Sequence, residues 1–287
     1  MRPLPKLTDR LPLGGSGLEV SPFCLGMVID PATVIAAYDA GINFFFLTAD
    51  MHWPLYEGTR RGLAELLAAR PAARDAIVVA VTSYVTQPEF CWAPFQEVLA
   101  TVPALRWIDL TIAGGAYAHE IAQRSKLYEL QRQQRYLGAR AAGVTFHDRQ
   151  AARAMLDGGA LDIAFVRYNP LHPGARDDLF PYVAPRGAGR STLLYNFKST
   201  MGHAGDVEWA QLGVGADYWR PHITDYYRFA LAQPALDGIL CSLPAPFAVG
   251  ELVCALDKGA LDDDDQQYLL DLGELGRGAA TLAPTGT

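Results

Sequence analysis

The sequence predicts an α/β protein built as a single (β/α)8 TIM barrel, with an N-terminal β-hairpin and an extra C-terminal helix. Three observations support this fold class. Apolar runs without alternation, typical of strands buried on both faces, alternate with helical segments at intervals of roughly 30 residues. No linker rich in serine or glycine divides the chain. One barrel is routinely about 250 residues long, so we expect one domain over residues 1–287.

The first element is a hairpin, because Leu11–Val20 carries two short apolar arms around the Gly14–Gly17 turn. The expected strands are Phe23–Met27, Asn43–Thr48, Ala76–Ser83, Trp107–Ala113, Ala142–Thr145, Ile163–Tyr168, Thr192–Tyr195 and Gly238–Leu243. The expected helices are Pro31–Ala40, Glu57–Ala69, Pro88–Leu99, Ala118–Tyr136, Arg149–Leu156, Asp177–Val183, Ile223–Ala232 and Phe247–Leu256. The extra helix, Asp262–Leu275, begins with aspartates that favour the positive end of its dipole. We expect residues 1–10 and 277–287 to be flexible.

Composition narrows the classes of partner. Half of the residues are hydrophobic and the formal net charge is −7, so the chain has no basic surface for nucleic acid. No apolar run is long enough for a signal sequence or a membrane span, which leaves small molecules as the expected partners. The widely spaced cysteines predict reduced thiols and a cytoplasmic location. These cysteines are Cys24, Cys91, Cys241 and Cys254.

Several segments, in this order, resemble the aldo-keto reductases across nearly the whole chain. The matching segments are Leu13–Ser21, Gly41–Phe45, Thr48–Asp50, Tyr168–His172 and Tyr226–Leu231 ahead of Gly238–Leu240. The resemblance implies a barrel enzyme that reduces carbonyl groups with a nicotinamide cofactor. It also implies a catalytic group of Asp, Tyr, Lys and His, in which the tyrosine delivers a proton.

Most of that catalytic group is absent here. The four family positions fall on Phe46 or Leu47, on His52, on Ser83 and on Gly114 or Gly115. Tyr56 lies four residues beyond His52 and would reach the tyrosine position only if the loop bulges, whereas Tyr84 directly follows Ser83. The sequence therefore predicts a degraded catalytic tetrad.

The expected contacts to the cofactor are also reduced. Thr145 with Phe146 stands where the family holds the nicotinamide carboxamide with Ser and Asn, and Phe165 replaces a glutamine. Tyr195 matches the aromatic residue that stacks on the nicotinamide ring. The segment that starts at Ser242 carries no charge for the phosphates, and each such contact is worth roughly 1.5–3 kcal/mol. We therefore expect no cofactor or weak NADPH binding, with Tyr195, Lys198 and Ser242 as the contacts.

Active sites of such barrels lie at the carboxyl ends of the strands, and these ends are rich in polar residues here. The candidate catalytic residues are Asp50, His52, Tyr56, Tyr84 and His147. The candidate substrate-binding residues are Trp53, Asn169, His172 and Asn196. A His and an Asp close together can supply acid/base catalysis.

Structural roles for the same residues remain open. Asp50 with His52 would cap the following helix, Tyr56 and Tyr84 would pack at the rim, and Asp148 beside His147 would be an N-cap. His172 would serve its loop and Lys198 a surface ion pair. No metal site is predicted, because His52, His147 and His172 show no short ligand spacing.

Three functions follow from these observations. The leading hypothesis is a diverged enzyme that acts on a small polar or carbonyl metabolite by non-redox acid/base chemistry, such as elimination, isomerisation or cyclisation. The alternative is an NAD(P)H-dependent oxidoreductase in which Asp50 and Tyr56 have moved into the lost roles. The third is a non-catalytic binding protein on a dead reductase scaffold. The substrate and the oligomeric state are left open by the sequence.

Overall fold

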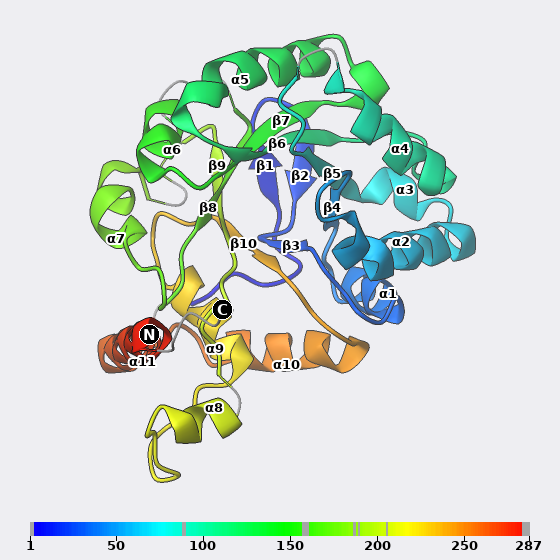
Figure 1. Ribbon diagram of the computed structural model, residues 1–287. Helices are drawn as coiled ribbons and strands as arrows, with labels where there is room; N and C mark the ends of the chain where they lie inside the picture. The colour runs from blue at the N-terminus through cyan, green and yellow to red at the C-terminus, as the bar shows by residue number, and fades with distance from the viewer. Residues whose placement is uncertain are drawn as a thin grey trace.

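The computed structural model describes residues 3–87, 90–156, 161–185, 188, 190–204 and 206–282. Its parallel strands close into a barrel in the order β10-β3-β4-β5-β6-β7-β8-β9, and β1 and β2 pair as a separate antiparallel hairpin (Figure 1). The strands are β1 (Leu11–Leu13), β2 (Leu18–Val20), β3 (Phe23–Leu25), β4 (Phe44–Thr48), β5 (Val78–Ser83), β6 (Leu110–Ala116), β7 (Ala141–Phe146), β8 (Ile163–Arg167), β9 (Leu193–Phe197) and β10 (Gly238–Cys241). The predicted (β/α)8 barrel with its hairpin is confirmed.

Helices surround this barrel, as Figure 1 shows. They are α1 (Ala32–Asp39), α2 (Glu57–Ala69), α3 (Ala73–Ala76), α4 (Ala93–Thr101), α5 (Ala118–Gln133), α6 (Arg149–Leu156), α7 (Ala175–Asp178), α8 (Asp206–Gln211), α9 (Ile223–Leu231), α10 (Pro246–Asp257) and α11 (Asp263–Leu282). Short 3₁₀ helices are η1 (Trp53–Tyr56), η3 (Pro103–Leu105), η4 (Tyr136–Gly138) and η5 (Phe180–Tyr182). No helix among the described residues is long and apolar enough to cross a membrane.

Some expected elements need correction. The helix predicted at Asp177–Val183 is instead the four-residue α7 followed by η5, because Pro181 cannot donate the backbone hydrogen bond that a continuing α-helix needs. The strand predicted at Trp107–Ala113 begins only at Leu110. The first two residues of the helix predicted at Pro88–Leu99 lie outside the described residues, and α4 begins at Ala93. The final helix continues to Leu282, beyond its expected end at Leu275.

The hairpin lies at the amino ends of the barrel strands. Asn43, directly before β4, donates from Nδ2 to the carbonyl oxygen of Glu19 at 2.9 Å and accepts the Ser21 N–H at 2.7 Å. Leu13 and Val20 on the hairpin are completely buried. These contacts leave the opposite end of the barrel, at the carboxyl ends of the strands, open for a binding site.

Aromatic rings fill the middle of the barrel. Phe165 on β8 contacts Phe46 on β4 edge to face, with ring centroids 5.5 Å apart, and Tyr195 on β9 at 5.7 Å. Tyr195 in turn contacts Phe44 at 5.8 Å. The barrel is therefore a packed core rather than a pore, and any ligand has to bind above this aromatic layer.

Candidate active site at the carboxyl ends of the barrel strands

A cavity of about 420 Å³ lies at the carboxyl ends of the strands, above the aromatic layer. Its polar lining residues are His52, Tyr56, Tyr84, Thr145, His147, Lys198, Ser199, Thr200, Tyr227 and Ser242. Its apolar lining residues are Met27, Phe46, Leu55, Phe197, Met201 and Leu240. Among these, Lys198 carries the only permanent charge. Although most of the lining residues carry a polar group, most of the surface they expose to the cavity is apolar, as is usual for a small-molecule site.

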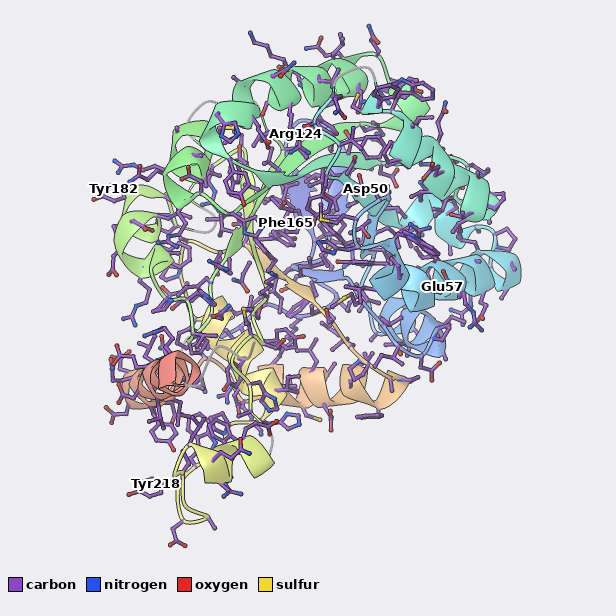
Figure 2. All side chains as sticks on the ribbon, viewed as in Figure 1. Asp50, Glu57, Arg124, Phe165, Tyr182 and Tyr218 are labelled. Atoms are coloured by element: carbon purple, nitrogen blue, oxygen red, sulfur yellow. The ribbon has the colours of Figure 1, made fainter. Side chains whose placement is uncertain are left out.

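Tyr84 is held in this cavity by Asp50 from the neighbouring strand end. Oδ2 of Asp50 accepts the Tyr84 N–H and the Ser83 hydroxyl, both at 2.8 Å. Figure 2 places Asp50 near the middle of the ring of helices, although its side chain does not line the cavity. Asp50 is therefore placed to position Tyr84 rather than to contact a ligand.

The Tyr84 ring occupies the space beside Gly114 on β6. A Cβ added at Gly114 would lie 2.8 Å from Cε1 and 2.9 Å from Cδ1 of Tyr84. The His52 ring contacts Tyr84 edge to face at 5.2 Å between centroids. The family's histidine position falls on Gly114 or Gly115. Gly114 has no room for a side chain, because the Tyr84 ring from the adjacent strand end fills that volume.

Arg124 on α5 braces the same two strand ends, and sequence analysis did not identify it. Its guanidinium donates from Nη1 to the carbonyl oxygen of Gly114 and from Nη2 to that of Ser83, each at 2.8 Å, and its side chain is 3% exposed. Burial raises the pKa of the Tyr84 phenol, the Asp50 carboxylate raises it further, and Arg124 opposes this shift. The sequence pattern of polar residues after strands does not point to Arg124, because Arg124 reaches the site from a helix.

Tyr56 is a second phenol in the cavity. It closes the 3₁₀ helix η1, is 8% exposed and lies 6.0 Å from the Phe46 ring between centroids. Burial strongly raises its pKa, with a smaller contribution from Tyr84. Tyr56 therefore stays protonated across the physiological pH range and can act as a hydrogen-bond donor in the cavity.

His147 and Phe197 form the opposite wall. The His147 ring contacts Phe197 edge to face at 5.8 Å between centroids. Burial lowers the pKa of His147, and the nearby cations Lys198 and Arg167 lower it further. The imidazole is therefore neutral at neutral pH, with one nitrogen able to donate and the other to accept a hydrogen bond.

The assignment of Tyr195 as the aromatic residue that stacks on a ligand is corrected by the structure. Tyr195 is completely buried, and its hydroxyl donates to the carbonyl oxygen of Ser21 at 2.7 Å, toward the amino end of the barrel. Phe197 lies two residues further along β9, so it shares the inward direction but sits nearer the open end. The aromatic ring that lines the cavity is that of Phe197.

The predicted substrate-binding residues do not line the cavity either. Asn169 is completely buried, donates from Nδ2 to the Lys198 carbonyl oxygen at 2.8 Å and accepts the His172 N–H at 2.8 Å. Asn196 is likewise buried; it donates to the Tyr168 carbonyl oxygen at 2.6 Å and accepts the hydroxyl of Ser199. Trp53 is 46% exposed and packs against the guanidinium of Arg60. These side chains, with His172, support the loops around the site.

Lys198 and Ser242 lie at the cavity as the sequence predicts. Lys198 has a left-handed backbone with φ of 57°, and its carbonyl oxygen is fixed by Asn169. The Ser242 N–H donates to the Tyr227 hydroxyl at 3.1 Å, which donates back to the Ser242 carbonyl oxygen at 2.9 Å. Within the described part of the chain, no group of three or more His, Cys, Asp or Glu side chains could hold a metal ion.

Comparison with known proteins places this geometry in context. No family model and no curated protein sequence matches the chain. Aldo-keto reductase AKR11C1 from Bacillus halodurans, in its holo form, has a TM-score of 0.71 at 14% identity over 92% of this chain and 96% of that one. The glycerol dehydrogenase AKR11B4 from Gluconobacter oxydans has a TM-score of 0.66 at 14% identity, covering 98% of both chains.

A third structure, Bombyx mori aldo-keto reductase AKR2E4 in complex with NADP, has a TM-score of 0.66 at 15% identity over 92% of both chains. At such low identity the likeness establishes the fold. The chain has the barrel fold of the aldo-keto reductases, as the segments matched in its sequence predict.

Proposed function

We propose that this protein is an aldo-keto-reductase-like enzyme that reduces the carbonyl group of a small molecule with a nicotinamide cofactor, with Tyr84 as the proton donor. The observation that carries the proposal is the placement of the Tyr84 phenol. Asp50 fixes the backbone N–H of Tyr84, and the ring lies in the cavity, beside His52 and in the volume above Gly114. Reduction of a carbonyl requires a proton donor at its oxygen, and a positioned phenol can serve as that donor.

The comparisons favour reduction over the non-redox chemistry that led the hypotheses from the sequence. The similar structures are reductases and a dehydrogenase, and one of them was determined with NADP. Elimination, isomerisation or cyclisation is not supported by any of these neighbours.

The cavity fits the nicotinamide end of such a cofactor. Phe197 offers an aromatic ring. The Thr145 hydroxyl accepts the Gly115 N–H at 2.7 Å, which leaves its own O–H to donate to a carboxamide. For the phosphates, Lys198 is the only charged residue on the described cavity wall, so binding is expected to be weak. When bound, the cofactor would supply a hydride to the carbonyl carbon of the substrate.

Side chains of the protein would donate a proton to the carbonyl oxygen and then replace it. Because burial and Asp50 raise the pKa of Tyr84, the phenol is protonated at neutral pH and can donate to the carbonyl oxygen. Arg124 stabilises the phenolate that this transfer leaves, since its charge acts against the pKa increase. His52, beside the ring and exposed to solvent, would return a proton from water. The cavity also limits access of water to the reacting atoms.

Binding and turnover test the proposal separately. We expect NADPH to quench the protein fluorescence saturably, and Phe197→Ala to weaken binding by roughly threefold to tenfold because one stacking contact is lost. Tyr195→Phe is the matched control, because the Tyr195 ring lies below the cavity and should leave binding unchanged. With a panel of aldehydes and ketones, Tyr84→Phe should lower kcat by about 10²–10⁴. Absence of quenching at near-millimolar NADPH, or turnover that needs no NADPH, would refute the proposal.

A further inference from the structure

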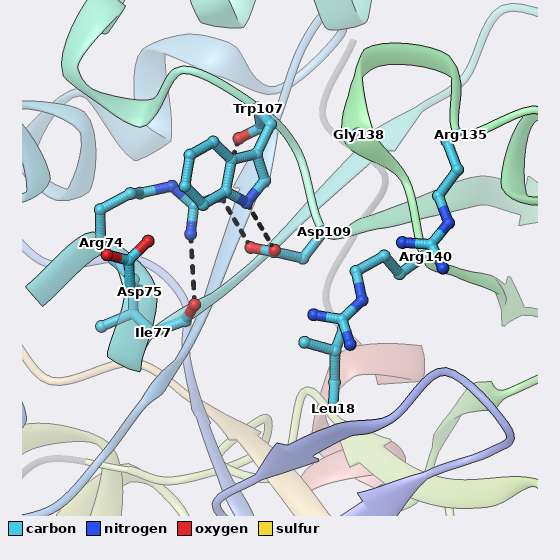
Figure 3. A pocket seen from close by; sticks show the side chains of 9 residues that line it. All are labelled: Leu18, Arg74, Asp75, Ile77, Trp107, Asp109, Arg135, Gly138 and Arg140. Carbon is cyan, nitrogen blue, oxygen red and sulfur yellow. Dashed lines mark hydrogen bonds and ion pairs between the residues drawn. The ribbon is translucent and has the colours of Figure 1, made fainter.

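A second pocket, of about 380 Å³, lies at the amino end of the barrel, on the opposite side from the candidate active site. It is formed between the hairpin, the α3–β5 segment and the loop that joins α5 to β7. Figure 3 shows Arg135 and Arg140 on one side of this pocket and Arg74, Asp75 and Ile77 on the other. No step of the proposed reaction uses these residues.

On one wall of the pocket, the charges of Arg74 and Asp109 cancel and their hydrogen bonds are made within the protein. Arg74 is 1% exposed; it donates to Asp109 Oδ2 at 2.9 Å and to the carbonyl oxygens of Leu105 and Trp107 at 2.6 and 2.9 Å. Asp109 also accepts the Val79 N–H and the Trp107 indole N–H, both at 2.8 Å. This buried pair therefore offers no net charge to a ligand.

The other wall carries two arginines without a carboxylate partner among the described residues. Arg140 donates from Nη2 to the Ser16 carbonyl oxygen at 3.0 Å, and its Nε is buried with no hydrogen-bond partner. Arg135 takes part in no ion pair with the described chain. Asp75, on the opposite side of the pocket, lies 3.6 Å from Arg106. Two unpaired positive charges therefore face this pocket in a chain whose net charge is −7.

The backbone holds Arg135 in this place at a cost. Arg135 and Leu137 have φ of 54° and 52°, in the left-handed region that residues other than glycine rarely adopt. Such strain persists only where the surrounding structure fixes it, and it concentrates at ligand-binding positions.

We propose that this pocket binds a small phosphate monoester, with Arg135 and Arg140 as the residues that hold the phosphate group. Two guanidinium groups match the charge of a phosphate dianion, whereas a carboxylate would neutralise only one of them. The planar N–H donors of arginine also fit phosphate oxygens in pairs. The volume exceeds what inorganic phosphate needs, so the rest of the pocket accommodates the organic part of the ligand.

Calorimetric titration of the full-length protein with glycerol phosphate tests the site. We expect saturable binding that weakens about tenfold or more in Arg135→Gln, because one charge-assisted contact is lost. Arg61→Gln is the control: Arg61 is an exposed arginine on α2 and does not line the pocket. This variant should bind like the wild type. Arg140→Gln provides a second variant, with thermal melts to show that each protein is folded.

Two further ligands identify the chemistry. Glycerate, which carries a carboxylate in place of the phosphate, should bind at least tenfold more weakly than glycerol phosphate. Inorganic phosphate should also bind more weakly, because it leaves most of the pocket unfilled. Equal binding of all three anions, equal affinities in Arg135→Gln and wild type, or no binding at millimolar concentration would overturn the proposal. None of these measurements depends on NADPH or on turnover, so failure here is distinct from failure of the proposed reduction.

Discussion

The substitution Gly114→Ala offers a direct test of the role given to Tyr84. A Cβ at position 114 would lie 2.8 Å from the Tyr84 ring, whereas ordinary contact begins at 3.4 Å, so the ring has to move by at least about 0.6 Å. A misplacement of about 1 Å at a reacting group can lower the rate by about 10². We therefore expect Gly114→Ala to reduce kcat/KM by roughly 10–100-fold while NADPH affinity stays within a factor of about two.

The assay is steady-state consumption of NADPH with the best carbonyl substrate of the panel, together with a thermal melt of each variant. Gly250→Ala on α10 is the matched control, because a Cβ there meets nothing within 4 Å. It should retain full activity and gain about 0.5–1 kcal/mol of stability from the better helix former. Wild-type turnover in a folded Gly114→Ala variant would refute the assignment of Tyr84 as the proton donor.

Further predictions concern stability, titration and thiol reactivity. Asp109→Ala leaves the buried Arg74 unpaired and should lower the free energy of unfolding in urea by about 3–5 kcal/mol, whereas Asp75→Ala, at an exposed pair, should cause no measurable change. The pKa of His147 is lowered by burial and then by Lys198, so Lys198→Met should raise it only part of the way toward 6.5 in an NMR titration. Because the pKa of His147 is lower in the folded protein than in the unfolded chain, the unfolded chain binds the imidazole proton more tightly. His147 should therefore lower the free energy of unfolding as the pH falls below 6.5, and His147→Gln should remove that contribution. Burial raises the pKa of the Cys24 thiol, and that of Cys241 to about 12, so a thiol reagent should label the exposed Cys254 first, as peptide mapping would show.

The barrel itself could be predicted because its strands are continuous apolar runs and its helices follow at regular spacing. The helix Glu57–Ala69 was predicted with the bounds that the structure shows. The errors arise where tertiary contacts override local signals. The last helix was expected to end at Leu275, before Gly276, yet α11 runs on to Leu282. Within this helix Gly273 provides close packing, since a Cβ there would lie 2.3 Å from the Pro170 carbonyl oxygen.

The candidate site could be predicted only in part. The rule that polar residues after barrel strands converge brought His52, Tyr56, Tyr84 and His147 to one cavity, together with Lys198 and Ser242. The match to the family pattern placed the stacking aromatic residue at Tyr195, because such a match does not give the depth of a residue within its strand, whereas the ring that lines the cavity is that of Phe197. The rule for strand ends could not separate side chains that face the cavity from those, such as Asn169 and Asn196, whose polar atoms are consumed by loop carbonyls.

The two differences from the family pattern, a glycine at position 114 and a tyrosine at position 84, depend on each other. In this backbone a side chain at 114 and the ring of Tyr84 compete for one volume, so the chain can carry a polar group from β6 or a phenol following β5, but not both. Asp50 and Arg124 then act on the phenol through the backbone of Ser83, Tyr84 and Gly114. Hydrogen bonds that serve only packing would not require an acid and a buried arginine to converge on two strand ends, because an apolar rim would cost less desolvation. The arrangement therefore favours a replaced proton donor over a scaffold that has merely lost its catalytic group.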